Sequence, residues 1–310
     1  MTKFIDSTKV NSRPIATSFI RKMRGGSQSC LVQASDDHYY VVKLLGNPQG
    51  STVLFSEAFG TLLMRETGLP VSKWCPIEIS DEFIDRNPGL WFETSMSGHQ
   101  RPPAGLHFGS RLVIPGNSEN LYELLPRSWF GLIRNREDFI GVLLFDLWAN
   151  QADNRQAIFI QNVVDRSIKA IFIDQGCLFK AGNDHQPNSA KALYLDSLIY
   201  TNLDINSIIS IWEARFLSFD WEKIKSVAAS GAIPAQWYTP GNLDRIVSGM
   251  IERQSLLRAY SHCIKRCLNT PSSRKNLNNW NRRLDDIQSH STQLCSDGHR
   301  RVGRPLSRVS

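Results

Sequence analysis

Short apolar runs separated by turn-forming residues occupy the chain from residue 15 to about residue 95. Runs of this length between turn signals are typical of β-strands. The pattern predicts strands at residues 17–23, 30–34, 39–45, 74–80 and 89–94. We therefore expect the first part of the chain to form a small, mainly β lobe.

One helix is predicted among these strands. Apolar residues recur at helical spacing from Val53 to Leu63, and Gly68 and Pro70 then provide a stop signal. We expect this helix to span residues 53–67.

Helical patterns dominate the second half of the chain. The expected helices span residues 126–134, 136–149, 193–201, 205–217, 220–229 and 242–268. Between the second and third of them, two apolar runs, 157–160 and 170–173, flank polar turn residues and predict a hairpin. Residues 97–120, rich in Gly, Pro, Ser and Asn, predict a long irregular connection that holds a hinge.

These elements predict an α+β fold with a small β-rich N-lobe and a larger helical C-lobe. With 310 residues, the chain is long enough to bury a substantial core. The expected parts are an N-terminal segment (1–14), the N-lobe with the hinge region (15–120), the helical C-lobe with the loops of the site (121–270), and a basic tail (271–310).

The positive charge is concentrated in this tail. The formal net charge is +7, and residues 271–310 hold eight Lys and Arg against three Asp, which contributes +5 and leaves +2 for the rest. Few apolar residues accompany the charge, so the tail is interpreted as a largely disordered, solvated terminus. Transient contact with nucleic acid is the alternative, although no aromatic ladder supports it.

The expected compartment is the cytoplasm. No run of 18 or more apolar residues occurs, and the first residues lack the apolar stretch of a secretory signal. Six cysteines in a chain of this length form no dense disulfide framework, which suits reduced thiols in a reducing compartment. No membrane partner is expected.

Two acidic residues flank the predicted hairpin. Asp153 precedes its first strand, and Asp174 follows its second strand in Asp174-Gln175-Gly176. A hairpin returns the chain beside itself, so both carboxylates are expected in one cleft. In phosphoryl transfer one carboxylate orients the accepting hydroxyl and another holds magnesium. Each Asp taken alone is equally typical of a turn.

A single cation interrupts the predicted strand at residues 39–45. Lys43 would be costly to bury without a partner, and Glu57 on the following helix is the obvious one. Kinases use such a strand Lys and helix Glu pair to direct an ammonium group at nucleotide phosphates. The alternative is an edge-strand Lys whose ammonium group reaches water.

A glycine-rich turn joins the first two predicted strands. Gly25, Gly26, Ser27 and Gln28 would let backbone N–H groups approach phosphate oxygens. A simple hairpin turn is the alternative for a glycine pair at this place.

Taken in order, the glycine turn, strand Lys, helix Glu, loop Asp and strand Asp-x-Gly resemble the HipA-like kinases. The resemblance covers roughly residues 15 to 265. It runs through Gly25-Gly26-Ser27-Gln28, Tyr40-Val41-Val42-Lys43, Ser56-Glu57, Gly68-Leu69-Pro70-Val71, His107-Phe108-Gly109-Ser110, Phe145-Asp146-Leu147-Trp148-Ala149-Asn150, Asp153-Asn154-Arg155-Gln156 and Ile173-Asp174-Gln175-Gly176.

The resemblance implies a two-lobed protein-kinase-like fold with ATP and Mg²⁺ between the lobes. It implies that Lys43 and the glycine turn contact the nucleotide and that Glu57 positions Lys43. It also implies that Asp153 is the catalytic Asp and that Asp174 binds the metal. His107 and Phe108, in the expected irregular connection, would line the mouth of the cleft, touch the acceptor, or anchor a turn.

One position departs from the family pattern. Many members carry a metal-binding Asn five residues after the catalytic Asp, where this chain has Ile158. Gln156 offers an amide oxygen nearby and becomes a candidate metal ligand. Arg155, a candidate catalytic residue, would brace the loop, contact phosphates, or form a surface salt bridge.

The function predicted from the sequence is that of an ATP-dependent kinase. Its acceptor would be a protein Ser or Thr hydroxyl, so a protein substrate is the expected partner. A pseudokinase or nucleotide-binding scaffold without turnover is the alternative, because of Ile158. A nucleic-acid-associated protein acting through its tail is the third possibility.

Overall fold

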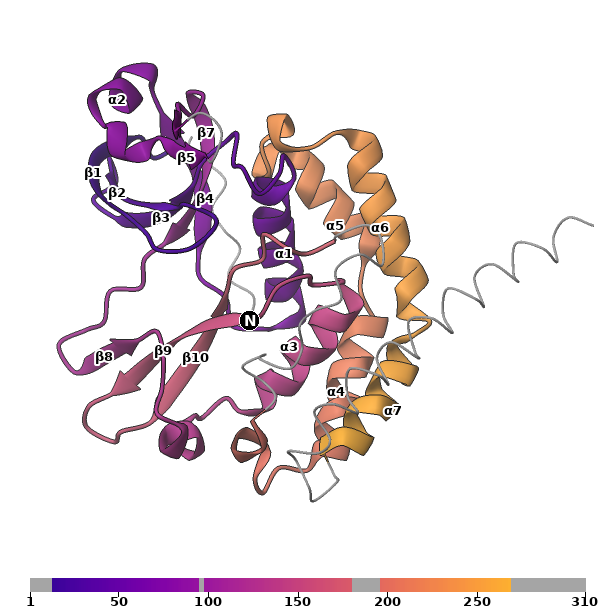
Figure 1. Cartoon of the computed structure of the whole chain (residues 1–310). Coiled ribbons are helices and arrows are strands. Elements are labelled where there is room, and N and C mark those ends of the chain that lie inside the picture. Colours follow the sequence, from indigo (N-terminus) through magenta and orange to yellow (C-terminus); the bar gives the residue numbers. More distant parts are fainter. Residues whose placement is uncertain (1–12, 95–97, 180–195, 269–310) are drawn as a thin grey trace, which may run out of the picture.

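The computed structural model describes residues 13–94, 98–179 and 196–268. Strands dominate the N-terminal part of this region and helices dominate the C-terminal part, and the two lie side by side (Figure 1). The α+β fold class with a small β-rich N-lobe and a larger helical C-lobe is therefore confirmed.

The N-lobe is built on a five-stranded antiparallel sheet. Its strands, in spatial order, are β1 (Ala16–Lys22), β2 (Cys30–Ala34), β3 (Tyr39–Lys43), β7 (Gly105–Arg111) and β4 (Trp74–Ile79). The sheet curls until its two ends meet, because Ile15 forms a parallel bridge with Glu78 of β4. The short helix α2 (Asp81–Arg86) and the small hairpin of β5 (Phe92–Thr94) and β6 (Gly98–Gln100) complete the lobe.

The expected irregular connection at residues 97–120 is wrong. This segment contains β6, the whole of β7, and the start of β8 (Glu119–Tyr122). The two glycines of β7 made it resemble a loop, but Gly109 has a packing role: a Cβ there would lie 2.3 Å from Cγ1 of Ile77. The segment without strands between the lobes is therefore short, residues 112–118.

The helix predicted at residues 53–67 is present with the same bounds, as α1 (Val53–Thr67). Gly68 ends it in the left-handed conformation with φ of 89°, and the N–H of Leu69 donates to the carbonyl of Met64 at 2.9 Å. All of its residues are buried except Arg65 and Glu66. A helix that is buried on every side belongs to the interior of a protein and not to its surface.

Five more α-helices lie in the described part of the C-lobe. They are α3 (Glu137–Trp148), α4 (Ile205–Leu217), α5 (Trp221–Val227), α6 (Pro240–Gln254) and α7 (Leu257–Leu268). Two predicted segments form short 3-10 helices instead, Arg127–Leu132 and Ser197–Tyr200. The expected helix at 242–268 is wrong as one element; at the break the hydroxyl of Ser255 donates to the carbonyl of Glu252 at 2.7 Å.

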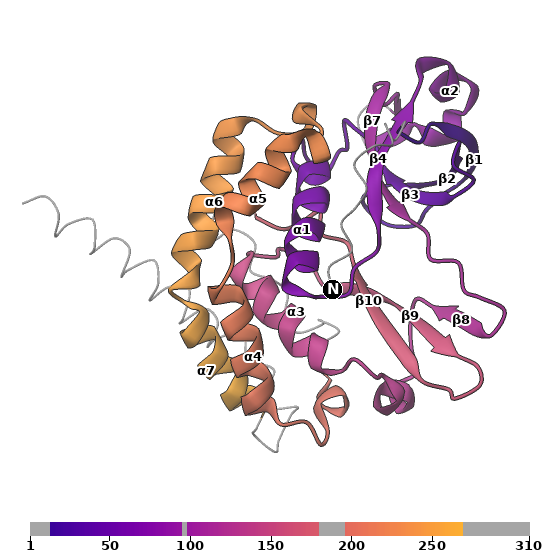
Figure 2. The same ribbon diagram turned by 180° about the vertical axis from the view of Figure 1, so that it is seen from behind.

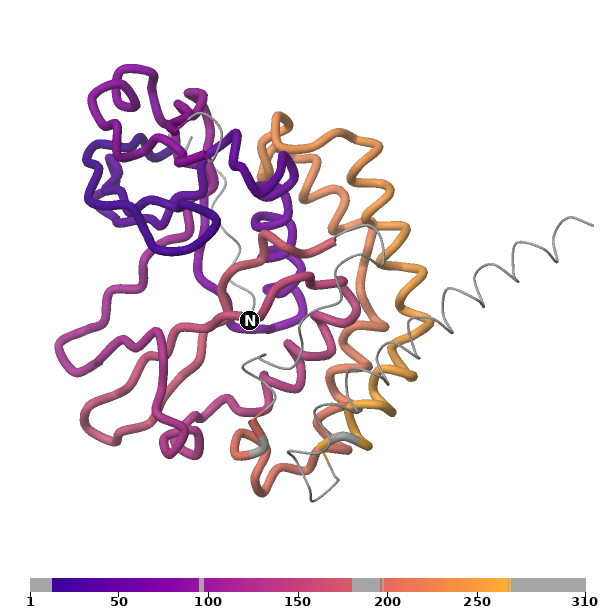
Figure 3. Tube along the Cα trace, in the orientation of Figure 1, coloured from indigo at the N-terminus to yellow at the C-terminus, as the bar shows by residue number. Residues whose placement is uncertain are grey.

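Helix α1 packs with the C-lobe, although its sequence lies between N-lobe strands. Seen from behind, it lies beside α5 and α6 (Figure 2), and the tube coloured by sequence shows its indigo segment next to the orange C-terminal helices (Figure 3). Rings of α1 contact distant segments, with Phe55 centred 5.0 Å from Tyr238 and Phe59 5.6 Å from Phe179.

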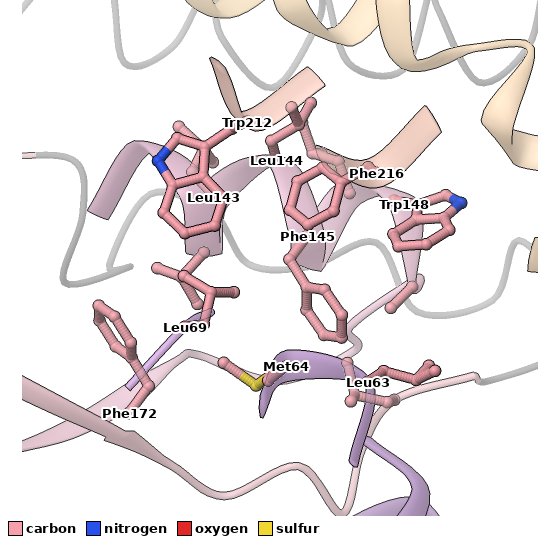
Figure 4. Close-up of a cluster of buried hydrophobic side chains, with 14 of the residues drawn as sticks. Leu63, Met64, Leu69, Leu143, Leu144, Phe145, Trp148, Phe172, Trp212 and Phe216 are labelled. Carbon is pink, nitrogen blue, oxygen red and sulfur yellow. The ribbon is translucent and has the colours of Figure 1, made fainter. Parts of the chain in front are cut away.

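The largest cluster of buried apolar side chains runs from α1 through α3 and α4. Leu63 and Met64 of α1 face side chains of α3 such as Phe145, and Trp212 and Phe216 of α4 lie above them (Figure 4). A second, smaller cluster fills the space enclosed by the curled sheet and α2. The sequence boundary between residues 120 and 121 therefore does not separate the two cores.

The hairpin predicted between the two acidic residues is confirmed. It consists of β9 (Gln156–Asn162) and β10 (Ile168–Ile173), and β8 pairs with the other side of β9. Gln156 pairs with Ile173 across the open end. The N–H of Phe172 donates to the carbonyl of Pro70 at 2.8 Å, which fixes β10 to the segment after α1.

No helix within the described ranges has both the length and the apolar composition that a bilayer span requires. The basic tail at residues 271–310 lies outside the described residues, so its interpretation stays a prediction.

We expect Gly141→Ala to destabilise the fold. A Cβ at Gly141 of α3 would lie 2.3 Å from the ring of Trp212, which is itself buried, so the core would have to shift. Overpacking of this kind costs about 1–3 kcal/mol of unfolding free energy, measurable by urea denaturation. Gly241→Ala, in the first turn of α6 with no atom within 4 Å, is the matched control and should change stability by less than about 1 kcal/mol.

Candidate functional site

Lys43 lies at the end of β3, an interior strand between β2 and β7. Phe108 of β7 is its direct partner across the strands, and directly paired residues share a face of the sheet. Phe108 belongs to the large cluster, whereas Val42 belongs to the cluster inside the N-lobe. Lys43 therefore points from the sheet toward α1 and the C-lobe. With 7% of its surface exposed on an interior strand, it is not an edge-strand Lys that reaches water.

The ammonium group of Lys43 binds two carboxylates. It contacts Oε1 of Glu57 on α1, which confirms the predicted pair, and Oδ1 of Asp174 at 2.7 Å. The other carboxylate oxygen of Glu57, Oε2, accepts a hydrogen bond from the backbone N–H of Gln175 at 3.0 Å. One cation thus joins a sheet strand, a core helix and the segment after the hairpin.

Burial and charge act in opposite directions on the pKa values of these groups. Burial would lower the pKa of Lys43, but the charges of Glu57 and Asp174 outweigh it and raise the value. Burial would raise the pKa of Asp174, but Lys43 holds it below its usual value. Burial raises the pKa of Glu57 in spite of Lys43. The ammonium and the Asp174 carboxylate are therefore both charged at neutral pH.

The backbone around Asp174 is held in an unusual conformation. Its φ of 65° lies in the left-handed region, and its carbonyl accepts hydrogen bonds from Nη1 of Arg155 at 3.2 Å and Nε2 of Gln151 at 3.3 Å. Two residues later, a Cβ at Gly176 would lie 2.9 Å from Oε1 of Glu57. Glycine is required there because the ion pair fills the space, a reason that the sequence does not reveal.

Arg155 is part of this support. Its side chain is fully buried, with Nε 3.1 Å from Oδ2 of Asp146 on α3 and Nη1 3.0 Å from the carbonyl of Ile173. The surface salt bridge considered from the sequence is therefore wrong. No role for Asp146 was predicted, although an acid within the otherwise apolar stretch from Phe139 to Trp148 is a signal that it has a buried partner.

The loop of Asp153 lies against the segment of Asp174. The N–H of Ala152 donates to the carbonyl of Cys177 at 3.0 Å, and Nε2 of Gln156 donates to Oδ2 of Asp174 at 3.1 Å. The Asp153 carboxylate is exposed and accepts a hydrogen bond from the N–H of the next residue at 2.7 Å. The structure thus brings the two acidic loops together at the open end of the hairpin.

The glycine turn connects β1 and β2 and is fixed to its neighbours. Gly25 has a φ of 120°. The side chain of Gln28 donates to the carbonyl of Glu93 at 2.8 Å and accepts from its N–H at 2.7 Å. Nδ2 of Asn47 donates to the carbonyl of Ser27 at 2.9 Å. The turn is therefore attached to β5 and to the loop that precedes α1, and the amide of Gln28 is engaged there.

His107 lies in the middle of β7 and not at the mouth of a cleft. It is completely buried, and its Nδ1 accepts a hydrogen bond from the N–H of Leu45 at 2.8 Å. Burial lowers the pKa of His107 to about 4, so the ring is neutral at physiological pH. It fixes the backbone two residues after Lys43, a role that sequence reasoning did not identify.

Asp174 is the acid through which this site would bind a divalent cation. Among the described residues, no group of three or more His, Cys, Asp or Glu side chains is close enough to hold a metal. Magnesium commonly uses one or two carboxylates together with phosphates of a bound nucleotide, and a single carboxylate beside Gln156 fits that pattern. The described residues offer no site in which protein carboxylates alone would hold the metal.

Comparison with known proteins gives weak similarities. No protein-family model matches the chain, and no curated protein does. The Helicobacter pylori proinflammatory kinase CtkA has a TM-score of 0.49 at 10% identity, over 81% of this chain and 97% of that chain. The Golgi casein kinase with Mn and ADP bound has a TM-score of 0.48 at 12% identity, over 80% and 72%. A further structure of the Golgi casein kinase gives 0.47 and 12%, over 84% and 73%.

We expect Lys43→Met to be strongly destabilising. The substitution leaves the buried carboxylate of Glu57 and the partly buried carboxylate of Asp174 without their cation. Removing one partner of a buried ion pair costs about 3–5 kcal/mol of unfolding free energy. Adding Glu57→Gln removes one of these charges and should restore part of the loss. Lys223→Met is the matched control, because Lys223 also pairs with an acid of α1, Glu66, but lies at the surface; its cost should stay below about 1 kcal/mol. Equal urea midpoints for Lys43→Met and Lys223→Met would contradict this.

We also expect Asp174→Asn to be more destabilising at neutral than at acid pH. The pKa of Asp174 is lower in the folded protein, so its contribution is present above the unfolded value of about 3.9 and disappears as the pH falls through the folded value. The difference in unfolding free energy between wild type and variant should therefore shrink as the pH falls below the unfolded value of about 3.9. A difference that stays constant or grows on acidification would argue against the ion pair.

Proposed function

We propose that the chain is an ATP-dependent kinase of the HipA-like type, which transfers the γ-phosphate to a Ser or Thr hydroxyl of a protein. The observation that carries this proposal is the buried ammonium of Lys43 between Glu57 on a core helix and Asp174 in an Asp-x-Gly segment. Catalysis of phosphoryl transfer consists almost entirely of positioning and charge stabilisation, and this is the combination of groups that it uses.

Lys43 would contact the nucleotide phosphates, and Glu57 would position it. Because Glu57 is almost completely buried and also bound by the N–H of Gln175, the ammonium group has one preferred place. Asp174 and the amide oxygen of Gln156 would hold Mg²⁺. When bound, the ion supplies positive charge to the β- and γ-phosphates.

An apolar surface beside Lys43 suits the base of a nucleotide. Leu31 of β2 and Val41 of β3 are paired across the strands, and Val41 lies two residues before Lys43, so all three share one face of the sheet. Leu31 and Val41 are only half-buried, whereas Val32 and Val42 on the opposite face are fully buried. Partly exposed apolar side chains next to a phosphate-binding cation are what a nucleotide site requires.

Asp153 would orient the accepting hydroxyl or take its proton. Its exposed carboxylate leaves room for a substrate, and its loop contacts the segment of Asp174. Arg155 acts on the reaction through the backbone at Asp174, so it is a positioning residue. Backbone N–H groups of Gly25, Gly26 and Ser27 would contact phosphates, while the contacts of Gln28 with Glu93 suit a residue that anchors the turn.

The proposed partners follow from this activity. The acceptor is a protein, and the proposed compartment is the cytoplasm. Transient binding of nucleic acid by the basic residues 271–310 remains a separate proposal, which deletion of these residues and a DNA-retention assay at several salt concentrations would test.

A nucleotide-binding scaffold without turnover is the second candidate. Two observations favour it: Ile158 stands at the position of the family's second metal ligand, and both carboxylate oxygens of Asp174 are engaged by protein donors. A scaffold binds ATP but shows no magnesium-dependent turnover, and calorimetric ATP binding combined with an autophosphorylation assay separates the two candidates.

We expect Asp153→Asn to abolish phosphotransfer without affecting the fold. Loss of a general base lowers the rate about 100-fold or more, measured as incorporation of radiolabelled γ-phosphate into the protein itself or a generic acceptor. Asp165→Asn, in the turn at the opposite end of the same hairpin, is the matched control and should retain full activity. Unchanged incorporation in both Asp153→Asn and Asp174→Asn would refute the assignment of these two residues to the reaction.

A further inference from the structure

The carboxylate of Asp174 is bound on both sides by donors from distant parts of the chain. Lys43 lies 2.7 Å from Oδ1 and Nε2 of Gln156 lies 3.1 Å from Oδ2. Both oxygens are thus occupied by hydrogen-bond donors, although the proposed function assigns this side chain to a metal. The following inference rests on that proposed function.

An ammonium group and a divalent cation compete for the same carboxylate. A cation bound to Asp174 would lie within a few ångström of the nitrogen of Lys43, and like charges repel strongly where little water screens them. Lys43 cannot easily withdraw, because Glu57 holds its other side and only 7% of its surface is exposed. The pair of Lys43 and Asp174 is therefore a barrier to binding of a metal alone.

Nucleotide phosphates change this competition between Lys43 and a metal ion for Asp174. They offer Lys43 alternative anionic partners and bring additional negative charge, so the ammonium can share Asp174 with a metal ion. Gln156 is exposed at the start of β9, so its amide can turn to present its oxygen at small cost. No cluster of three or more carboxylate, His or Cys ligands exists in residues 13–94, 98–179 and 196–268 to bind the metal independently.

We propose that Lys43 occupies the place of the metal on Asp174 until nucleotide phosphates engage the ammonium group, so that nucleotide and metal bind with positive coupling. The coupling is reciprocal: the nucleotide raises the affinity for the metal by the same factor by which the metal raises the affinity for the nucleotide. The consequence is that the loss of Lys43 strengthens binding of the metal alone while it weakens binding of the nucleotide.

The first test is a titration with Mn²⁺ alone, by calorimetry or by electron paramagnetic resonance of the free ion. Wild type should bind Mn²⁺ weakly without nucleotide, and Lys43→Met should bind it about tenfold more tightly or better. Lys223→Met, which breaks the surface ion pair with the same helix, should bind Mn²⁺ as wild type does. Asp174→Asn added to Lys43→Met should abolish the gain.

A second variant keeps the proposal testable if Lys43→Met is too unstable for a binding measurement. The double variant Lys43→Met with Glu57→Gln keeps Asp174 but removes one uncompensated buried charge, and it should still bind Mn²⁺ more tightly than wild type. If the folded double variant, checked by its thermal melt, binds Mn²⁺ no more tightly than wild type, the proposal is overturned.

The reciprocal test uses the wild-type protein with ADP. Saturating ADP should tighten Mn²⁺ binding about tenfold or more, and Mn²⁺ should tighten ADP binding by the same factor. Equal affinities with and without the other ligand would overturn the coupling. These binding readouts do not depend on phosphotransfer, so an inactive protein that passes them is a scaffold with coupled sites, and an active one that fails them is a kinase without this coupling.

Discussion

The three-way contact of Lys43, Glu57 and Asp174 is the interaction on which the rest of the structure depends. Charged groups buried to this extent are costly unless each has a partner, so their geometry constrains every element that carries them. It fixes the end of β3, the N-terminal half of α1 and the segment after β10 relative to one another. It also requires Gly176, because a side chain at that position would collide with Glu57.

The core explains why this contact is well defined. Helix α1 is buried along nearly its whole length and packs on α3, so Glu57 is held by apolar contacts on either side of it in the sequence. The ammonium group is therefore positioned from the C-lobe core, through α1, as much as from the sheet that carries Lys43. A kinase needs this property, since the charge that faces the phosphates must already be in place when the nucleotide binds.

A second buried ion pair supports the two loops at the open end of the hairpin. Asp146 on α3 holds the guanidinium group of Arg155, which in turn binds the carbonyls of Ile173 and Asp174. The loop that carries Asp153 and the segment that carries Asp174 are thus fixed to the same core helix. Because the proposed coupling between nucleotide and metal acts through Asp174, this support holds in place the backbone that carries that carboxylate.

The sequence by itself determined the elements that rest on local signals: β2, α1, α4 and the hairpin of β9 and β10 have the expected places, since hydrophobic period and stop signals are local. It also identified Lys43 and Glu57 as a pair, because a strand cation needs a nearby acid. Only the tertiary structure decided the rest. The glycines of β7 make a central strand resemble a loop, although Gly109 is needed there for packing against Ile77. Asp174 reaches Lys43 from 131 residues away. Contacts of that separation depend on how the whole chain packs, and no local pattern encodes them.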